Sequence, residues 1–133
     1  ALVRKLHGIW NTGDISQVGA VYSEDFIVHW LSAVPPYKAH GRKGVERAIT
    51  ETKIGFSDWH EEIVDLLIDK DRVVTRYISS GTHSGEYSGI KPTGKKILLN
   101  EISIFCVKQD LISEQWCVDN IMSLMAQLNG QID

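Results

Sequence analysis

Residues 96–119 read KILLNEISIFCVKQDLISEQWCVD. Both halves of this stretch are rich in Ile, Leu, Val and Trp, and apolar positions alternate with polar ones, which is typical of β-strands that cover a core with one face. The three residues Lys108, Gln109 and Asp110 between the halves are a short polar connection of the length that closes a hairpin. The stretch therefore predicts two antiparallel strands, at about 96–108 and 111–119.

Two earlier segments, at about 59–69 and 72–83, have the same β-prone composition. The short connection at 69–71 again has the length of a hairpin, whereas a longer loop from Ser84 to Lys95 joins this pair to the next. The second half of the chain therefore predicts four strands in an antiparallel meander.

The first half of the chain has helical periodicity instead. Apolar residues recur at helical spacing up to Trp10, again from Ile15 to about residue 22, and from Gly41 to Phe56. An apolar run at 26–31 is interpreted as a short strand or pocket wall. The prediction is one α+β domain over residues 1–133, in which three N-terminal helices pack on a strongly curved antiparallel sheet and enclose a pocket.

The composition excludes several classes of protein. The chain has 133 residues, a net charge of −3, 43% hydrophobic and 23% charged residues, which suits one globular domain rather than a disordered segment. No basic stretch suggests nucleic acid as a partner, and no run of about 18 apolar residues suggests a membrane span. The expected location is cytoplasmic, since the N-terminus lacks the apolar block of a signal peptide.

Metal and nucleotide sites have no support in the sequence. The five histidines show no zinc-like spacing. Residues 89–96, GIKPTGKK, resemble a phosphate-binding loop, but Lys96 stands where that motif needs a hydroxyl, and a strand follows instead of a helix. We expect neither a metal nor a cofactor.

Asp119 is the best candidate for general acid/base chemistry. It ends the mostly apolar strand 111–119, where loss of hydration raises the pKa of a carboxyl group towards a useful range. The alternative is structural, because an Asp at this point can cap the helix that follows at about 120–128.

The remaining site candidates are mostly aromatic. His29 lies in the apolar run 26–31 and is either a core residue or a catalytic helper. Arg76 and Glu101 lie on strands among apolar neighbours, so one of them can face inward. The residues that we expect to line a pocket for a flat hydrophobic ligand are Trp10, Trp30, Trp59, Trp116, Phe26, Tyr77 and Glu101.

The order of these pieces resembles the SnoaL-like polyketide cyclase family of the NTF2-like superfamily. The matching pieces run through nearly the whole chain: 10–14, 25–29, 40–44, 56–58, 71–76, 81–85, 92–95 and 114–119. The family also places a histidine on the strand before the last, and strand 96–108 has none.

The resemblance implies an aldol ring closure on an aromatic polyketide ester, without metal or cofactor. It maps the acid/base role onto Asp119 and a helper role onto His29. Two other functions stay open: a protein of the same fold that binds a hydrophobic small molecule without turnover, and an epoxide hydrolase or isomerase of the same superfamily. An open sheet face in so small a domain also predicts a homodimer.

Overall fold

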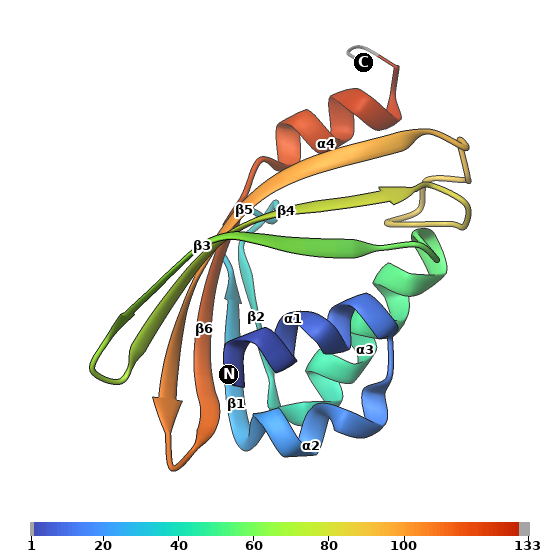
Figure 1. The fold of residues 1–133 in the computed structure, drawn as a ribbon. Helices are drawn as coiled ribbons and strands as arrows, with labels where there is room; N and C mark the ends of the chain where they lie inside the picture. The colour runs from blue at the N-terminus through green and yellow to red at the C-terminus, as the bar shows by residue number, and fades with distance from the viewer. Residues whose placement is uncertain (1, 131–133) are drawn as a thin grey trace.

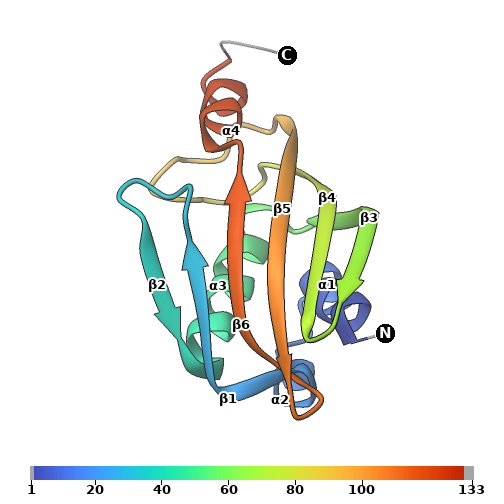
Figure 2. The same cartoon turned by 90° about the vertical axis from the view of Figure 1, so that its left-hand side faces the viewer.

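One six-stranded sheet dominates the computed structural model, which describes residues 2–130. Its order is β2-β1-β6-β5-β4-β3, and the last four of these strands form the expected antiparallel meander (Figure 2). The strands are β1 (Tyr22–Trp30), β2 (Tyr37–His40), β3 (His60–Asp69), β4 (Arg72–Thr82), β5 (Lys96–Lys108) and β6 (Leu111–Asp119).

One strand pair departs from the expected antiparallel arrangement, because β1 runs parallel to β6. The apolar run at 26–31 is part of this longer strand β1, which also pairs with β2 in the antiparallel sense. Parallel neighbours need a long connection, and here the connection contains α3 (Gly41–Gly55) and the four strands β2 to β5. The α+β class is confirmed, with a mixed sheet.

The helices lie mainly on one side of the sheet. Figure 1 shows α1 (Leu2–Thr12), α2 (Val18–Val21) and α3 grouped on the same side, with α4 (Ile121–Leu128) above the first half of β5. The second expected helix is shorter than its periodicity suggested: it consists of a 3₁₀ turn, η1 (Ile15–Gln17), followed by one turn of α2. Asp14 caps this segment by accepting a hydrogen bond from Ser16 N–H at 3.2 Å.

Side chains alternate strictly across the middle of the sheet. On β5, Leu99 and Phe105 are buried against the helices, whereas Ile102 and Ile104 are exposed on the outer face. Register shifts in the β1–β6, β3–β4 and β5–β6 pairs mark local irregularities of the kind that bend strands. The sheet therefore has a concave inner face, and the helices close over part of it. No helix within residues 2–130 has the length and apolar character needed to cross a membrane.

Candidate active site

A cavity of about 1100 Å³ opens on the concave face of the sheet. Helices α1, α3 and α4 contribute to its wall, together with parts of the loops after β1 and after β4. Six of the expected site residues line it: Trp10, Trp30, Trp59, Tyr77, Glu101 and Asp119. These six residues give the cavity wall four aromatic side chains and two carboxyl groups.

Asp119 lies at the end of β6 with its side chain in the cavity wall. Its Oδ1 atom is buried and has no hydrogen-bond partner among residues 2–130. The capping role considered for it belongs to the next residue, because Asn120 Oδ1 accepts the hydrogen bond from Ser123 N–H at 3.2 Å. Burial raises the pKa of the Asp119 carboxyl.

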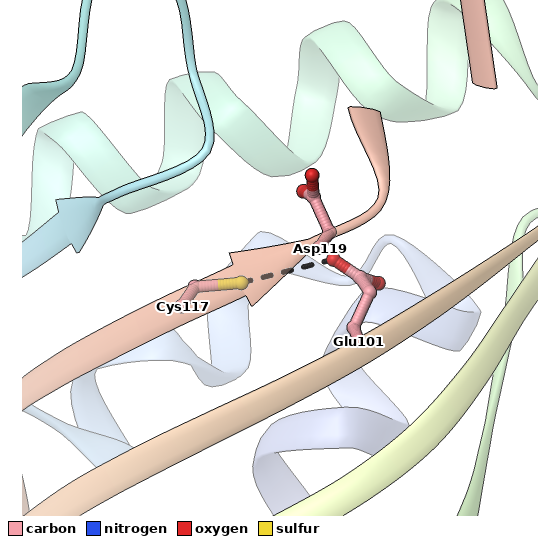
Figure 3. A group of neighbouring side chains, drawn as sticks. All are labelled: Glu101, Cys117 and Asp119. Atoms are coloured by element: carbon pink, nitrogen blue, oxygen red, sulfur yellow. Dashed lines mark hydrogen bonds between the residues drawn. The ribbon is translucent and has the colours of Figure 1, made fainter. Parts of the chain in front are cut away.

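Glu101 lies beside Asp119, because the two residues are register partners on the adjacent strands β5 and β6. It is buried, and it accepts a hydrogen bond from Ser79 Oγ. It also accepts one from Cys117 Sγ at 3.7 Å, drawn as a dashed line in Figure 3. Burial raises the pKa of Glu101 well above its ordinary value, and the nearby charge of Glu61 raises it further. Glu101 therefore favours its neutral form, and Asp119 is the carboxyl group that ionises more readily.

Glu101, Cys117 and Asp119 each offer one atom to a common point, with these atoms within 4.8 Å of one another. A divalent cation needs deprotonated ligands. Burial raises the pKa of both Glu101 and the Cys117 thiol well above their ordinary values, so protonated forms are favoured at two of the three positions. The arrangement suits proton chemistry better than metal binding.

His29 and Trp116 lie on the outer face of the sheet. His29 Nε2 is 2.6 Å from Glu114 Oε2, and the His29 ring stacks on Trp116 with centroids 5.1 Å apart. Arg72 Cζ lies 5.2 Å from the Trp116 ring centroid. The structure therefore does not bring His29 to Asp119, because the side chains that point inward from these strands belong to their neighbours, Val28 and Cys117.

Two other sequence candidates also lie away from the cavity. Phe26 is buried in the core, edge-on to Tyr22 with ring centroids 4.7 Å apart, and it is not among the residues that line the cavity. Arg76 is half exposed and donates to Asp65 Oδ2 at 2.7 Å. Of the pair Arg76 and Glu101, only Glu101 faces inward.

A buried polar group in the cavity wall was missed by the sequence analysis. His7 Nδ1 lies 2.6 Å from Glu61 Oε1, and His7 Nε2 lies 3.0 Å from Thr75 Oγ1. Trp59 Nε1 donates to Glu61 Oε2 at 2.9 Å. A signal existed for both ionisable residues: His7 shares a helix face with Trp10, three residues on, and Glu61 follows Trp59 by two on the strand side that faces the core.

Comparison with known proteins gives the family. A family model described as SnoaL-like polyketide cyclase matches residues 1–128. The chain belongs to the SnoaL-like polyketide cyclase family. A comparison with curated protein sequences found no match.

Solved structures with the NTF2-like fold resemble this SnoaL-like protein over almost its full length. IdmH from Streptomyces antibioticus, proposed to be a polyketide cyclase, is 26% identical, with a TM-score of 0.82 and 96% of each chain covered. A proposed polyketide cyclase from Bacillus cereus is 28% identical, with a TM-score of 0.80 and coverage of 96% of this chain and 78% of the other. AclR from Streptomyces galilaeus, a proposed hydroxylase, is 23% identical, with a TM-score of 0.84 and coverage of 99% and 81%. The likeness to AclR shows the fold alone.

The SnoaL-like protein has an acidic residue on the strand before the last. Strand β5 carries no histidine, and Glu101 is its ionisable residue in the cavity. On β5 and β6 the cavity wall therefore carries two carboxyl groups in cross-strand register: Glu101 is buried and hydrogen-bonded, and Asp119 Oδ1 has no partner in the described part of the chain.

Proposed function

We propose that this protein is a cofactor-independent acid/base enzyme that acts on a hydrophobic, polyketide-like carbonyl compound, with Asp119 as the general base. The observation that carries the proposal is the Asp119 Oδ1 atom, which is buried in the cavity wall without a hydrogen-bond partner among the described residues. Buried polar atoms without partners are rare and cluster where function needs them. The aromatic wall supplies the surface on which a flat substrate packs.

The chemistry needs one base and good positioning. Asp119 takes a proton from a substrate carbon that lies between two carbonyl groups, so the C–H bond breaks and its electron pair passes into an enolate. The enolate carbon attacks a ketone carbon of the same substrate, so a C–C bond forms and the π bond of that carbonyl breaks. The ketone oxygen then takes the proton from Asp119 and becomes a hydroxyl group, which returns Asp119 to its carboxylate form. Holding both reacting carbons in place removes much of the entropic cost of the closure.

Glu101 supports this assignment through its protonation. Two negative charges at one end of an apolar cavity repel one another, so a pair of close carboxyl groups favours a state with one proton. Burial and the charge of Glu61 raise the pKa of Glu101, which leaves Asp119 as the charged member. His29 has no part in the proposed chemistry, because its ring stacks on the outer face.

The test is the Asp119→Asn variant, with rate and melting temperature measured on the same preparation. Asn keeps the size of the side chain but cannot carry the proton, so turnover of an aromatic polyketide ester falls by about 100-fold or more while the melting temperature barely changes. The matched control is Glu114→Gln, which removes a carboxyl group from the outer face and leaves the rate unchanged.

A second candidate function is ligand binding without turnover, favoured by the tryptophan-rich wall of the cavity. Full turnover by Asp119→Asn excludes Asp119 from the mechanism. A wild type that binds aromatic ligands but converts none of a panel of polyketide esters supports the binding protein.

We also propose that the protein is a homodimer. The outer face of the sheet carries exposed apolar residues on its middle strands, and apolar surface of this kind is usually covered by a partner. A second copy of the same chain is always available as this partner.

A further inference from the structure

Three tryptophans line the cavity, and their indole N–H groups differ in one respect. Trp10 Nε1 donates to Tyr22 Oη at 3.0 Å, and Trp59 Nε1 donates to Glu61 Oε2 at 2.9 Å. Trp30 Nε1 is buried as well but has no acceptor among residues 2–130. Buried N–H groups nearly always have an acceptor, so the group on Trp30 requires an explanation.

The backbone fixes Trp30 close to the base. Trp30 pairs with Cys117 in the β1–β6 register, and Leu31 N–H donates to Cys117 O at 3.1 Å. Two residues further along β6, Asp119 N–H donates to Ser32 Oγ at 2.9 Å. The two residues that follow the unpaired donor are thus tied by hydrogen bonds to the strand that carries the unpaired acceptor.

The two groups are complementary in kind. Trp30 Nε1–H can only donate, and an ionised Asp119 carboxylate can only accept. They do not satisfy one another, since both lack a partner within hydrogen-bond distance in the described part of the chain. A ligand that satisfies both groups must place a hydrogen-bond acceptor at Trp30 Nε1–H and a proton-bearing group at Asp119 Oδ1.

We propose that Trp30 Nε1–H donates a hydrogen bond to a carbonyl oxygen of the substrate and so selects aromatic ketones and quinones over plain aromatic rings. This inference rests on the proposed function only for the role of Asp119. The carbonyl oxygen accepts the hydrogen bond from Trp30 Nε1–H, and the acidic C–H group next to a carbonyl lies against Asp119 Oδ1. A plain hydrocarbon ring leaves both groups buried and unpaired, which weakens its binding.

The test compares two soluble probes with the same three-ring skeleton, anthraquinone-2-sulfonate and anthracene-2-sulfonate. Only the first carries ring carbonyl groups. We expect the wild type to bind the quinone about three- to tenfold more tightly, which is the range for one net hydrogen bond. Trp30→Phe keeps an aromatic ring but removes the donor, so the ratio of the two dissociation constants falls to about one.

The matched control is Trp10→Phe. Trp10 packs edge-on against Trp30 with centroids 6.3 Å apart, but its N–H group already has an acceptor in Tyr22. This variant therefore keeps the preference for the quinone even if both probes bind more weakly. Circular dichroism and melting temperature establish that both variants are folded.

Several outcomes overturn the inference: a wild type that binds neither probe or binds both equally, a Trp30→Phe variant that keeps the full preference, or equal losses in Trp30→Phe and Trp10→Phe. None of these outcomes depends on turnover. Full activity of Asp119→Asn contradicts the proposed function, whereas a preference for the quinone that Trp30→Phe does not change contradicts the inference alone.

Discussion

Glu101 is a carboxyl group held in an apolar setting, and its protonation ties stability to pH. Burial raises the pKa of Glu101 in the folded protein well above its value of 4.5 in the unfolded chain. Below that unfolded value both states hold the proton, and the carboxyl group does not oppose folding. As the pH rises towards the folded pKa, the unfolded chain releases the proton first, so this contribution to stability is lost.

The Glu101→Gln variant tests the direction of this pH dependence of stability. Gln does not titrate, so the melting temperature of the variant, relative to the wild type, increases steadily as the pH rises above about 4.5. The control is Glu62→Gln, which removes an exposed carboxyl group from the adjoining part of the sheet. If the difference in melting temperature between Glu101→Gln and wild type stays constant from pH 4 to 8, Glu101 is not a buried, neutral carboxyl group.

Strand alternation explains why some site residues could be predicted and others could not. Successive side chains on a strand point to opposite faces, so His29 and Trp30 do not share the cavity in a regular strand. For the same reason, the Trp116 side chain points to the opposite face of the sheet from Cys117 and Asp119. The sequence indicated which segments form the site, but these segments are apolar on both faces, so the pattern alone did not tell which face is inward.

At the scale of elements, α4 is the helix that closes the cavity beside Asp119. Its residues Met122 and Met125 line the cavity, and Leu124 and Leu128 anchor it in the core. The Asn120 cap holds its first turn, through the hydrogen bond from Ser123 N–H to Asn120 Oδ1. The start of this helix is therefore held by a polar side chain next to the proposed base, and the rest of the helix by its apolar anchors.

Asn120→Ala removes this cap. We expect the free energy of unfolding to fall by about 1 kcal/mol, because one N–H group at the start of α4 loses its acceptor. Asn120→Asp keeps a side-chain oxygen at the same place and serves as the control with nearly unchanged stability. Urea denaturation of both variants measures the difference, and equal loss in the two variants contradicts a capping role.

The elements differ in how far the sequence determined them. The meander was predictable because its hairpins are local: two-residue connections join β3 to β4 and β5 to β6. The parallel pairing of β1 with β6 joins residues 87 to 90 positions apart in the sequence, and no local pattern indicates such a contact. The short second helix had too few residues for periodicity to fix its length.

At the scale of the whole molecule, the outer face of the sheet is the surface that needs a partner. Ile102, Ile104 and Val118 are 47%, 40% and 49% exposed, and the register places Ile102 beside Val118 and Ile104 beside Trp116. The four side chains thus form one apolar patch on the middle strands. Figure 2 shows this side of the sheet towards the viewer, with α1 and α3 behind it.

Charged pairs surround the patch, as in interfaces that have an apolar centre and a polar rim. The His29–Glu114 pair lies on one side and the Arg76–Asp65 pair on the other. A twofold axis through the patch places the same surface on both partners, so one substitution at its centre acts twice. The patch therefore offers a sensitive site for testing the proposed dimer.

Ile104→Lys places a charge at the centre of the patch, and we expect it to convert a dimer into a folded monomer. The cost arises only in the dimer, where two ammonium groups would be desolvated next to each other, whereas in the monomer the side chain extends into water. Light scattering coupled to size-exclusion chromatography measures the mass. Ile15→Lys, which puts the same charge on an exposed isoleucine of η1 on the helix side, leaves the dimer intact. A wild type that stays monomeric at high concentration, or an Ile104→Lys variant that stays dimeric, would mean that this face does not pair two copies.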